Sequence, residues 1–133
     1  MKNLVKYEDW LNESNVDPSK IFRRKPTTDS YLNMRDFWRA ELGEDHENDI
    51  KLKQKMFVGA KMFSVNIDAI IPNQDYLDSD QIEKYASEDL KKAPEGVKFI
   101  DGTVVVFDGH HRIAAQILKG AKAINMKILK AKI

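Results

Sequence analysis

The sequence has no cysteine among its 133 residues. It therefore cannot form disulfides, thiolate metal sites or a cysteine nucleophile, and it fits a reducing compartment. Neither sign of charge is in excess, because the formal net charge is only +1. The whole-chain charge attracts neither nucleic acid nor a membrane surface, so any basic patch must be local.

Long apolar runs are also missing. No stretch approaches the roughly 20 apolar residues of a membrane-spanning helix. The opening segment, MKNLVKYEDWLNES, lacks the apolar region of a signal peptide. Hydrophobic residues make up 42% and charged residues 32% of the chain, a balance typical of a folded globular domain. We therefore predict a cytoplasmic protein with no membrane partner.

The composition and residue pattern of the chain change near residue 57. Residues 1–57 are rich in charge and in aromatic side chains, whereas residues 58–133 alternate between strand-like and helix-like patterns. We expect a helical N-terminal extension in the first part and one compact domain in the second. The oligomeric state is not predicted by any of these patterns.

Helical spacing recurs twice in the N-terminal part. Apolar residues share one helical face over residues 4–11 and again over residues 31–42. Asp29 or Ser30 is the expected cap of the second helix. The mixed-charge segment 44–55 is consistent with either a helix or a linker.

The second part predicts strands and helices in turn. Asp101-Gly102 stands between two apolar runs, which indicates a hairpin closed by a two-residue turn. The expected elements are a strand within 62–72, a helix within 79–92, a hairpin over 97–107, a helix over 110–120 and a last strand from 123. This order predicts an α/β (α+β) fold with a small mixed sheet and helices.

The segment that points to chemistry is the junction between a strand and a helix. An apolar run at 104–107 is followed by Asp-Gly-His-His-Arg at 108–112 and then by a helical pattern. The first amides of a helix lack internal partners and carry the positive end of its dipole. Gly109 allows a ligand to approach the backbone, and Arg112 can grip a phosphate with two hydrogen bonds. The two histidines would add donors whose charge varies near neutral pH. The pattern predicts an anion site.

Asp108 has several roles open to it at this junction. It can cap the helix, orient a histidine, hold Mg²⁺ or accept a proton from a hydroxyl. A purely structural interpretation also exists, in which Asp108 is only a cap, Gly109 serves the turn and Arg112 pairs with an acidic neighbour. A histidine metal site is disfavoured, because adjacent helical residues point about 100° apart and His46 lies in the other part of the chain.

Two segments resemble the core of the ParB/sulfiredoxin superfamily. They are SVNIDAIIPNQDYLDSDQIEKYASEDLKK and VVVFDGHHRIAAQILKGAKAINMKIL, and the resemblance covers about residues 62–130. The Asp-Gly-His-His-Arg form is similar to that of phage ParB-like proteins and a free serine kinase. A phage origin would place the protein in the host cytoplasm.

The resemblance implies a nucleotide site. In that superfamily the Gly-x-x-Arg turn cradles nucleotide phosphates, which implicates Gly109, His110, His111 and Arg112 in binding ATP or CTP with Mg²⁺. The kinase-like relatives further imply Asp108 as a base towards a hydroxyl. Glu88 is a weaker choice for an assisting carboxylate, made from its position in the helix before the hairpin.

The departures from the superfamily narrow the function. Partition proteins have Gly-Glu-Arg-Arg at the turn, whereas this chain has two histidines in the middle places. Their Asn-Pro-x-Gln-Pro-Arg segment is matched only in part, by PNQDYLD at 72–78. No helix-turn-helix follows within the chain. Sulfiredoxin chemistry is excluded because His110 stands in place of its cysteine.

Three functions remain at this stage. The first is Mg²⁺-dependent nucleotide hydrolysis or phosphoryl transfer at residues 108–112. The second is a ParB-like DNA-binding protein or nuclease, in which His110 or His111 would act as general acid or base. The basic cluster Arg23-Arg24-Lys25 would then contact the DNA backbone, although a solvated loop explains it as well. The third is a non-catalytic interaction module that uses the aromatic-rich N-terminal part.

Overall fold

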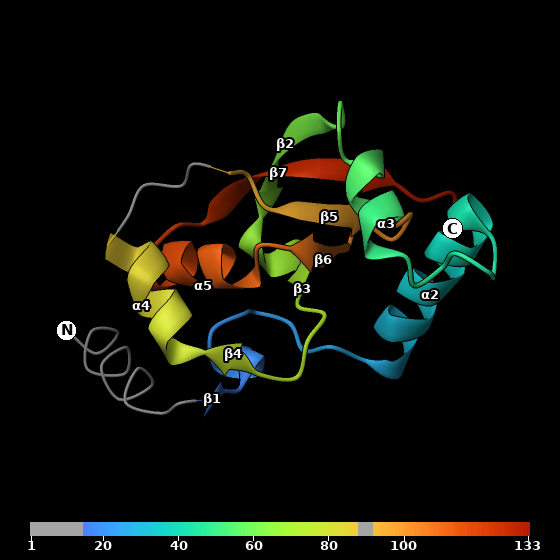
Figure 1. Ribbon diagram of the computed structural model, residues 1–133. Coiled ribbons are helices and arrows are strands. Elements are labelled where there is room, and N and C mark those ends of the chain that lie inside the picture. The colour runs from blue at the N-terminus through green and yellow to red at the C-terminus, as the bar shows by residue number, and fades with distance from the viewer. Residues whose placement is uncertain (1–14, 88–91) are drawn as a thin grey trace.

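A computed structural model describes residues 15–87 and 92–133 of the protein (Figure 1). The helix expected over residues 4–11 and the candidate Glu88 lie outside these ranges. The elements along the chain are β1 (Asn15–Val16), η1 (Pro18–Lys20), α2 (Thr28–Leu42), α3 (Ile50–Met56), β2 (Lys61–Asn66), η2 (Ile67–Ala69), β3 (Ile70–Ile71), β4 (Leu77–Asp78), α4 (Ser79–Ser87), β5 (Glu95–Lys98), β6 (Val104–Asp108), α5 (His110–Leu118) and β7 (Ala123–Lys130). In the part of the chain described here, no helix combines the length and apolarity needed to cross a bilayer.

Five strands form one mixed sheet in the order β2-β7-β5-β6-β3. β5 runs parallel to β7, β3 runs parallel to β6, and the other neighbours are antiparallel. A two-stranded antiparallel pairing of β1 with β4 lies apart from this sheet. The predicted α+β fold with a small mixed sheet is confirmed.

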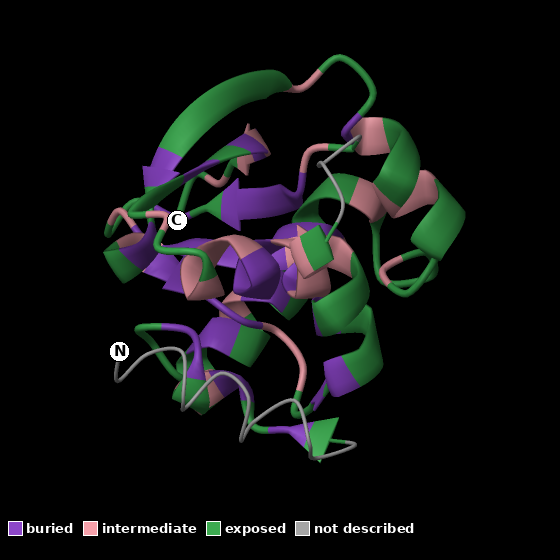
Figure 2. Cartoon of the chain, turned by 90° about the vertical axis from the view of Figure 1, so that its left-hand side faces the viewer, coloured by how far each residue is buried: buried purple, intermediate pink, exposed green. Residues whose placement is uncertain are grey.

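The strand β6, which lies between β5 and β3, divides the interior into two hydrophobic cores. Val104 and Val106 belong to a core that includes residues of α4 and α5, whereas Val105 belongs to a core with α2. Successive strand residues point to opposite faces, so an unbroken apolar run must be covered on both sides. The helix pairs α4–α5 and α2–α3 accordingly lie on opposite sides of the sheet in Figure 1. Figure 2 shows the buried residues concentrated in the middle of the molecule.

The N-terminal part packs into both cores. Val16 and Phe22 are buried in the core beside α5, while Met34 and Trp38 of α2 are buried against the other face. Phe37 and Trp38 are core residues, as their helical spacing favours, and they do not form a free stacking surface. Among the described residues, each core therefore contains side chains from before and after residue 57, so the change in composition there does not separate one core from the other.

The predicted hairpin is confirmed, but its turn is longer than expected. The amide of Phe99 donates to the carbonyl of Thr103 at 2.9 Å, and the amide of Gly102 donates to the carbonyl of Phe99 at 3.0 Å. Three residues, Ile100 to Gly102, thus form the loop, and not the two of the prediction. Gly102 has φ of 90°, the left-handed conformation that ends this loop type.

The N-cap of α2 is Thr27, so the expectation of Asp29 or Ser30 is wrong. Thr27 Oγ1 accepts from the Ser30 amide at 3.0 Å, and Ser30 Oγ accepts from the Thr27 amide at 2.8 Å. This reciprocal pair satisfies two amides that the helix itself leaves without partners. The segment 44–55, left open by the sequence, contains most of the short helix α3.

Thr27→Ala is expected to lower the free energy of unfolding by about 1 kcal/mol, because it removes one side of this capping box. Thr28→Ala is the matched control, since Thr28 is an exposed neighbour in the first turn. Urea unfolding of both variants checks the prediction. Equal stability of the two variants would contradict it.

Candidate functional site

The strand-to-helix junction lies where the sequence predicts it. β6 ends at Asp108, Gly109 is the N-cap residue, and α5 begins at His110. Gly109 has φ of 98° and ψ of 24°, a left-handed conformation that glycine adopts without strain. No side chain caps this helix start. The first amides of α5 therefore point out of the helix without a capping partner.

Arg112 folds back over Gly109. A Cβ added at Gly109 would stand 2.8 Å from Arg112 Nη2, so the guanidinium lies directly against the turn. Its carbon Cζ lies 5.7 Å from the ring centroid of Tyr85 in α4, a cation–π contact. Nη2 reaches Asp108 Oδ2 at 3.4 Å, while Nε is buried and has no hydrogen-bond partner. The arginine is thus held at the helix start with one donor unused.

Asp108 stands between two cations. Lys92 Nζ lies 3.2 Å from Asp108 Oδ2, closer than Arg112. Burial alone would raise the pKa of Asp108, but the hydrogen bond from Lys92 and the charges of Arg112 and Lys92 lower it on balance. The carboxylate is ionised at neutral pH and its side chain is 43% exposed.

A second carboxylate, Glu95, lies next to Asp108 on the neighbouring strand. The two residues are Cα partners on β5 and β6, next to an irregularity in the register. Glu95 is only 5% exposed, and burial raises its pKa, partly opposed by the charge of Lys92. Sequence spacing alone does not reveal Glu95 or Lys92, because strand register brings Glu95 to the junction and the connection before β5 brings Lys92 there.

His110 is a buried structural residue. Its Nε2 accepts a hydrogen bond from the Asn73 amide at 2.8 Å, and its ring centroid lies 6.4 Å from that of Phe22. Burial lowers the pKa of His110 to about 4, with a smaller contribution from His111. The expectation that its charge varies near neutral pH is therefore wrong.

His111 likewise accepts a backbone hydrogen bond, at the other end of residues 73–78. Its Nε2 accepts from the Asp78 amide at 3.0 Å, and burial is the main cause that lowers its pKa. Both rings thus present an unprotonated Nε2 to the backbone of residues 73–78. The two sequence segments on which the resemblance rests, 72–78 and 108–112, contact each other through these two bonds.

The other candidates lie elsewhere. Arg24 Nε donates to the Asp68 carbonyl at 2.6 Å. Arg24 and Lys25 line a cavity of about 380 Å³ whose wall also contains Asp29 and Asp101. None of residues 108–112 lines that cavity. Arg23, the third member of the basic cluster, is exposed.

The Mg²⁺ prediction concerns Asp108 alone. Within residues 15–87 and 92–133, no group of three or more His, Asp or Glu side chains is arranged to hold a metal. Mg²⁺ is commonly held by one or two carboxylates together with substrate phosphates. The half-buried, ionised Asp108 suits that mode, and its role towards Mg²⁺ stays a prediction.

Comparison with known proteins adds no relative to this picture. No protein-family model matches the chain, and a search of curated proteins finds no match. The resemblance to the ParB/sulfiredoxin superfamily therefore stays a prediction that rests on the Asp-Gly-His-His-Arg motif and on the order of elements.

Proposed function

We propose that the turn from Asp108 to Arg112 binds a phosphate group of a nucleotide, with ATP and CTP as the candidates. The observation that carries the proposal is the uncapped start of α5 beside an arginine whose buried Nε has no partner. A phosphate oxygen accepts from helix-start amides and from a guanidinium at once. A buried donor without a partner is costly, and a guanidinium that turned its Nε towards a bound anion would remove that cost.

Two cations and two carboxylates lie near the turn, so the support for an anion comes from the weak pairing of Arg112 and not from net charge. Arg112 Nη2 and Lys92 Nζ contact the same Asp108 oxygen at 3.4 and 3.2 Å. The contact from Arg112 is long for a charge-assisted bond. A phosphate at the turn would offer Arg112 a better acceptor, while Lys92 would continue to neutralise Asp108.

Asp108 is the residue we propose for chemistry, if turnover accompanies binding. Its lowered pKa keeps it ionised, so it can bind Mg²⁺ or accept a proton from an attacking hydroxyl or water. Bound Mg²⁺ would neutralise charge on the phosphates. The histidines are poorer acid–base candidates, because each Nε2 already accepts a backbone hydrogen bond. Nucleotide hydrolysis and phosphoryl transfer both stay within this proposal.

The binding test uses ATP and CTP, each with Mg²⁺, titrated by calorimetry into the wild type and into Arg112→Ala. Loss of two charge-assisted hydrogen bonds is expected to weaken binding about 100-fold. Arg35→Ala is the control, since Arg35 is an exposed arginine of α2 that pairs with Asp36. A wild type that binds neither nucleotide, or an Arg112→Ala variant that binds equally well, would refute the proposal.

A phosphate-release assay on the same samples separates binding from catalysis. Turnover by the wild type that Asp108→Ala abolishes would identify an enzyme. Binding without turnover would leave a nucleotide-binding protein. The DNA-binding alternative has less support, because the cavity beside Arg24 and Lys25 also contains Asp29 and Asp101. If the wild type bound no nucleotide, that result would favour the DNA-binding and interaction alternatives.

A further inference from the structure

A cavity of about 270 Å³ lies on the α2 side of the sheet, walled by α2, α3, β6 and the segment before β4. Tyr31, Trp38 and Phe107 give it aromatic walls. Trp38 and Phe107 pack against each other with ring centroids 5.5 Å apart. Small-molecule sites are typically apolar hollows with a few placed polar groups. The polar groups here are therefore the ones that decide what the cavity can bind.

Lys53 of α3 is the cation of this cavity. Its Nζ lies 5.2 Å from the centroid of the Trp38 ring, and it forms no ion pair within the described residues. Burial lowers its pKa, with Glu47 opposing.

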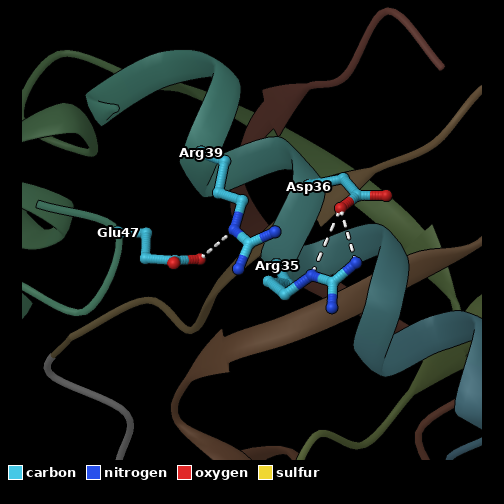
Figure 3. A network of polar contacts seen from close by, with 4 residues as sticks. All are labelled: Arg35, Asp36, Arg39 and Glu47. Atoms are coloured by element: carbon cyan, nitrogen blue, oxygen red, sulfur yellow. Dashed lines mark hydrogen bonds and ion pairs between the residues drawn. The ribbon is translucent and has the colours of Figure 1, made fainter. Parts of the chain in front are cut away.

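The two other charged side chains of the wall already have partners. Arg39 Nε donates to Glu47 Oε2 at 2.7 Å, and Arg35 pairs with Asp36 at 3.1 Å (Figure 3). Glu47 is thus neutralised by an arginine that does not line the cavity, and Arg35 is neutralised by its neighbour in sequence. Lys53 has no direct ion-pair partner among the described residues, because Glu47, whose charge acts on it, is already paired with Arg39, and an anionic ligand would supply one.

Asn73 has an unpaired hydrogen-bond acceptor, whereas Lys53 is a cation. Its backbone amide is fixed by His110 at 2.8 Å, while its side-chain Oδ1 is buried and has no hydrogen-bond partner. A buried acceptor without a donor is costly. Asn73 lines the cavity, so a ligand there can supply an N–H or O–H donor if the side chain turns its buried oxygen towards the cavity.

We propose that this cavity binds a small planar aromatic anion that also carries a hydrogen-bond donor. The ring packs on the aromatic wall, the anionic group pairs with Lys53, and the donor bonds Asn73 Oδ1. The site is separate from the proposed phosphate turn, and neither proposal depends on the other.

Three small probes test the two polar requirements. 4-Aminobenzoate has the ring, the anion and the donor, whereas benzoate lacks the donor and aniline lacks the anion. Calorimetry is expected to show 4-aminobenzoate binding about tenfold more tightly than either partial probe. The indole N–H signal of Trp38, distinguished from that of Trp10 by a Trp10→Phe variant, should shift on binding. No binding of 4-aminobenzoate by the wild type would overturn the proposal.

Two variants assign the preferences to residues. Lys53→Met keeps an apolar stem on Trp38 and should abolish the preference for 4-aminobenzoate over aniline. Lys55→Met, an exposed lysine of the same helix, should keep it. Asn73→Leu should abolish the preference for 4-aminobenzoate over benzoate, because it removes the side-chain acceptor. Its backbone amide can still donate to His110. Identical probe preferences in Lys53→Met and Lys55→Met would overturn the assignment even if Asn73→Leu failed to fold.

Discussion

Below pH 6 the protein is expected to lose stability that a His110→Gln variant retains. His110 is buried, its Nε2 accepts from the Asn73 amide, and its pKa falls from 6.5 to about 4 in the folded state. The unfolded chain therefore takes up the proton first as the pH falls. The contribution is complete above about pH 6.5 and is lost progressively towards pH 4. The total loss from this group is about 3 kcal/mol.

Glutamine is the informative replacement at this position. Its Oε1 can reach the Asn73 amide as the imidazole Nε2 does, but it does not titrate. The charged neighbours that face His110, namely His111 and Asp108, are present in both proteins, so their effects largely cancel. Urea unfolding between about pH 7.5 and 4.5 gives the free energy of unfolding of each protein.

His46→Gln is the control for this pH profile. His46 is exposed in the turn after α2, so its replacement should leave the wild-type profile intact. A His110→Gln variant that loses stability as steeply as the wild type would show that His110 is not buried as an acceptor. The Asn73 amide would then also lack protection from hydrogen exchange.

The order of most elements was predictable because it depends on local patterns, but the single strand expected within 62–72 is wrong: β2 and β3 lie there, separated by η2. Four apolar residues in sequence indicate a strand buried on both faces, and β6 is one. Alternation in the last strand predicts Ile124, Met126 and Ile128 as its buried face, and all three are in the core. Gly120 follows α5 with φ of 96°, as a glycine after a helix predicts.

The contacts of the site were not predictable, because they join residues far apart in sequence. The partners of the two histidines are Asn73 and Asp78, which lie 37 and 33 positions away. Adjacent histidines at a helix start indicate donors to a ligand, whereas these two act as acceptors for a neighbouring segment. Lys92 reaches Asp108 from a connection whose path depends on the whole fold.

Local competition explains the smaller errors. Threonine caps helices well, as aspartate and serine do, so local sequence does not separate Thr27 from the expected Asp29 and Ser30. The structure selects Thr27 because Ser30 then returns the bond. In the hairpin, Asp101 accepts from both the amide and the hydroxyl of Thr103, which favours the three-residue loop over the two-residue turn.

Gly109→Ala is expected to destabilise the protein far more than Gly120→Ala. Both glycines have nearly the same left-handed backbone, with φ of 98° and 96°. Alanine in that conformation costs about 1–2 kcal/mol at either position. A Cβ at Gly120 would meet nothing within 4 Å, whereas at Gly109 it would lie 2.9 Å from Pro94 Cβ and 3.0 Å from Pro94 Cα. Gly109→Ala should therefore cost about 3–4 kcal/mol in total, as measured by urea unfolding.

The same pair of variants separates packing from phosphate binding. At Gly109 the new methyl group would also stand 2.8 Å from Arg112 Nη2, and the flexible end of the arginine would move away from the turn. At temperatures where both variants are folded, Gly109→Ala should lose nucleotide affinity with Gly120→Ala unaffected. If Gly109→Ala were unstable yet bound nucleotide normally, the glycine would serve only the packing of Pro94, and the anion would have to bind elsewhere. Equal stability of the two variants would show that Pro94 does not lie against the turn, because the backbone strain is matched.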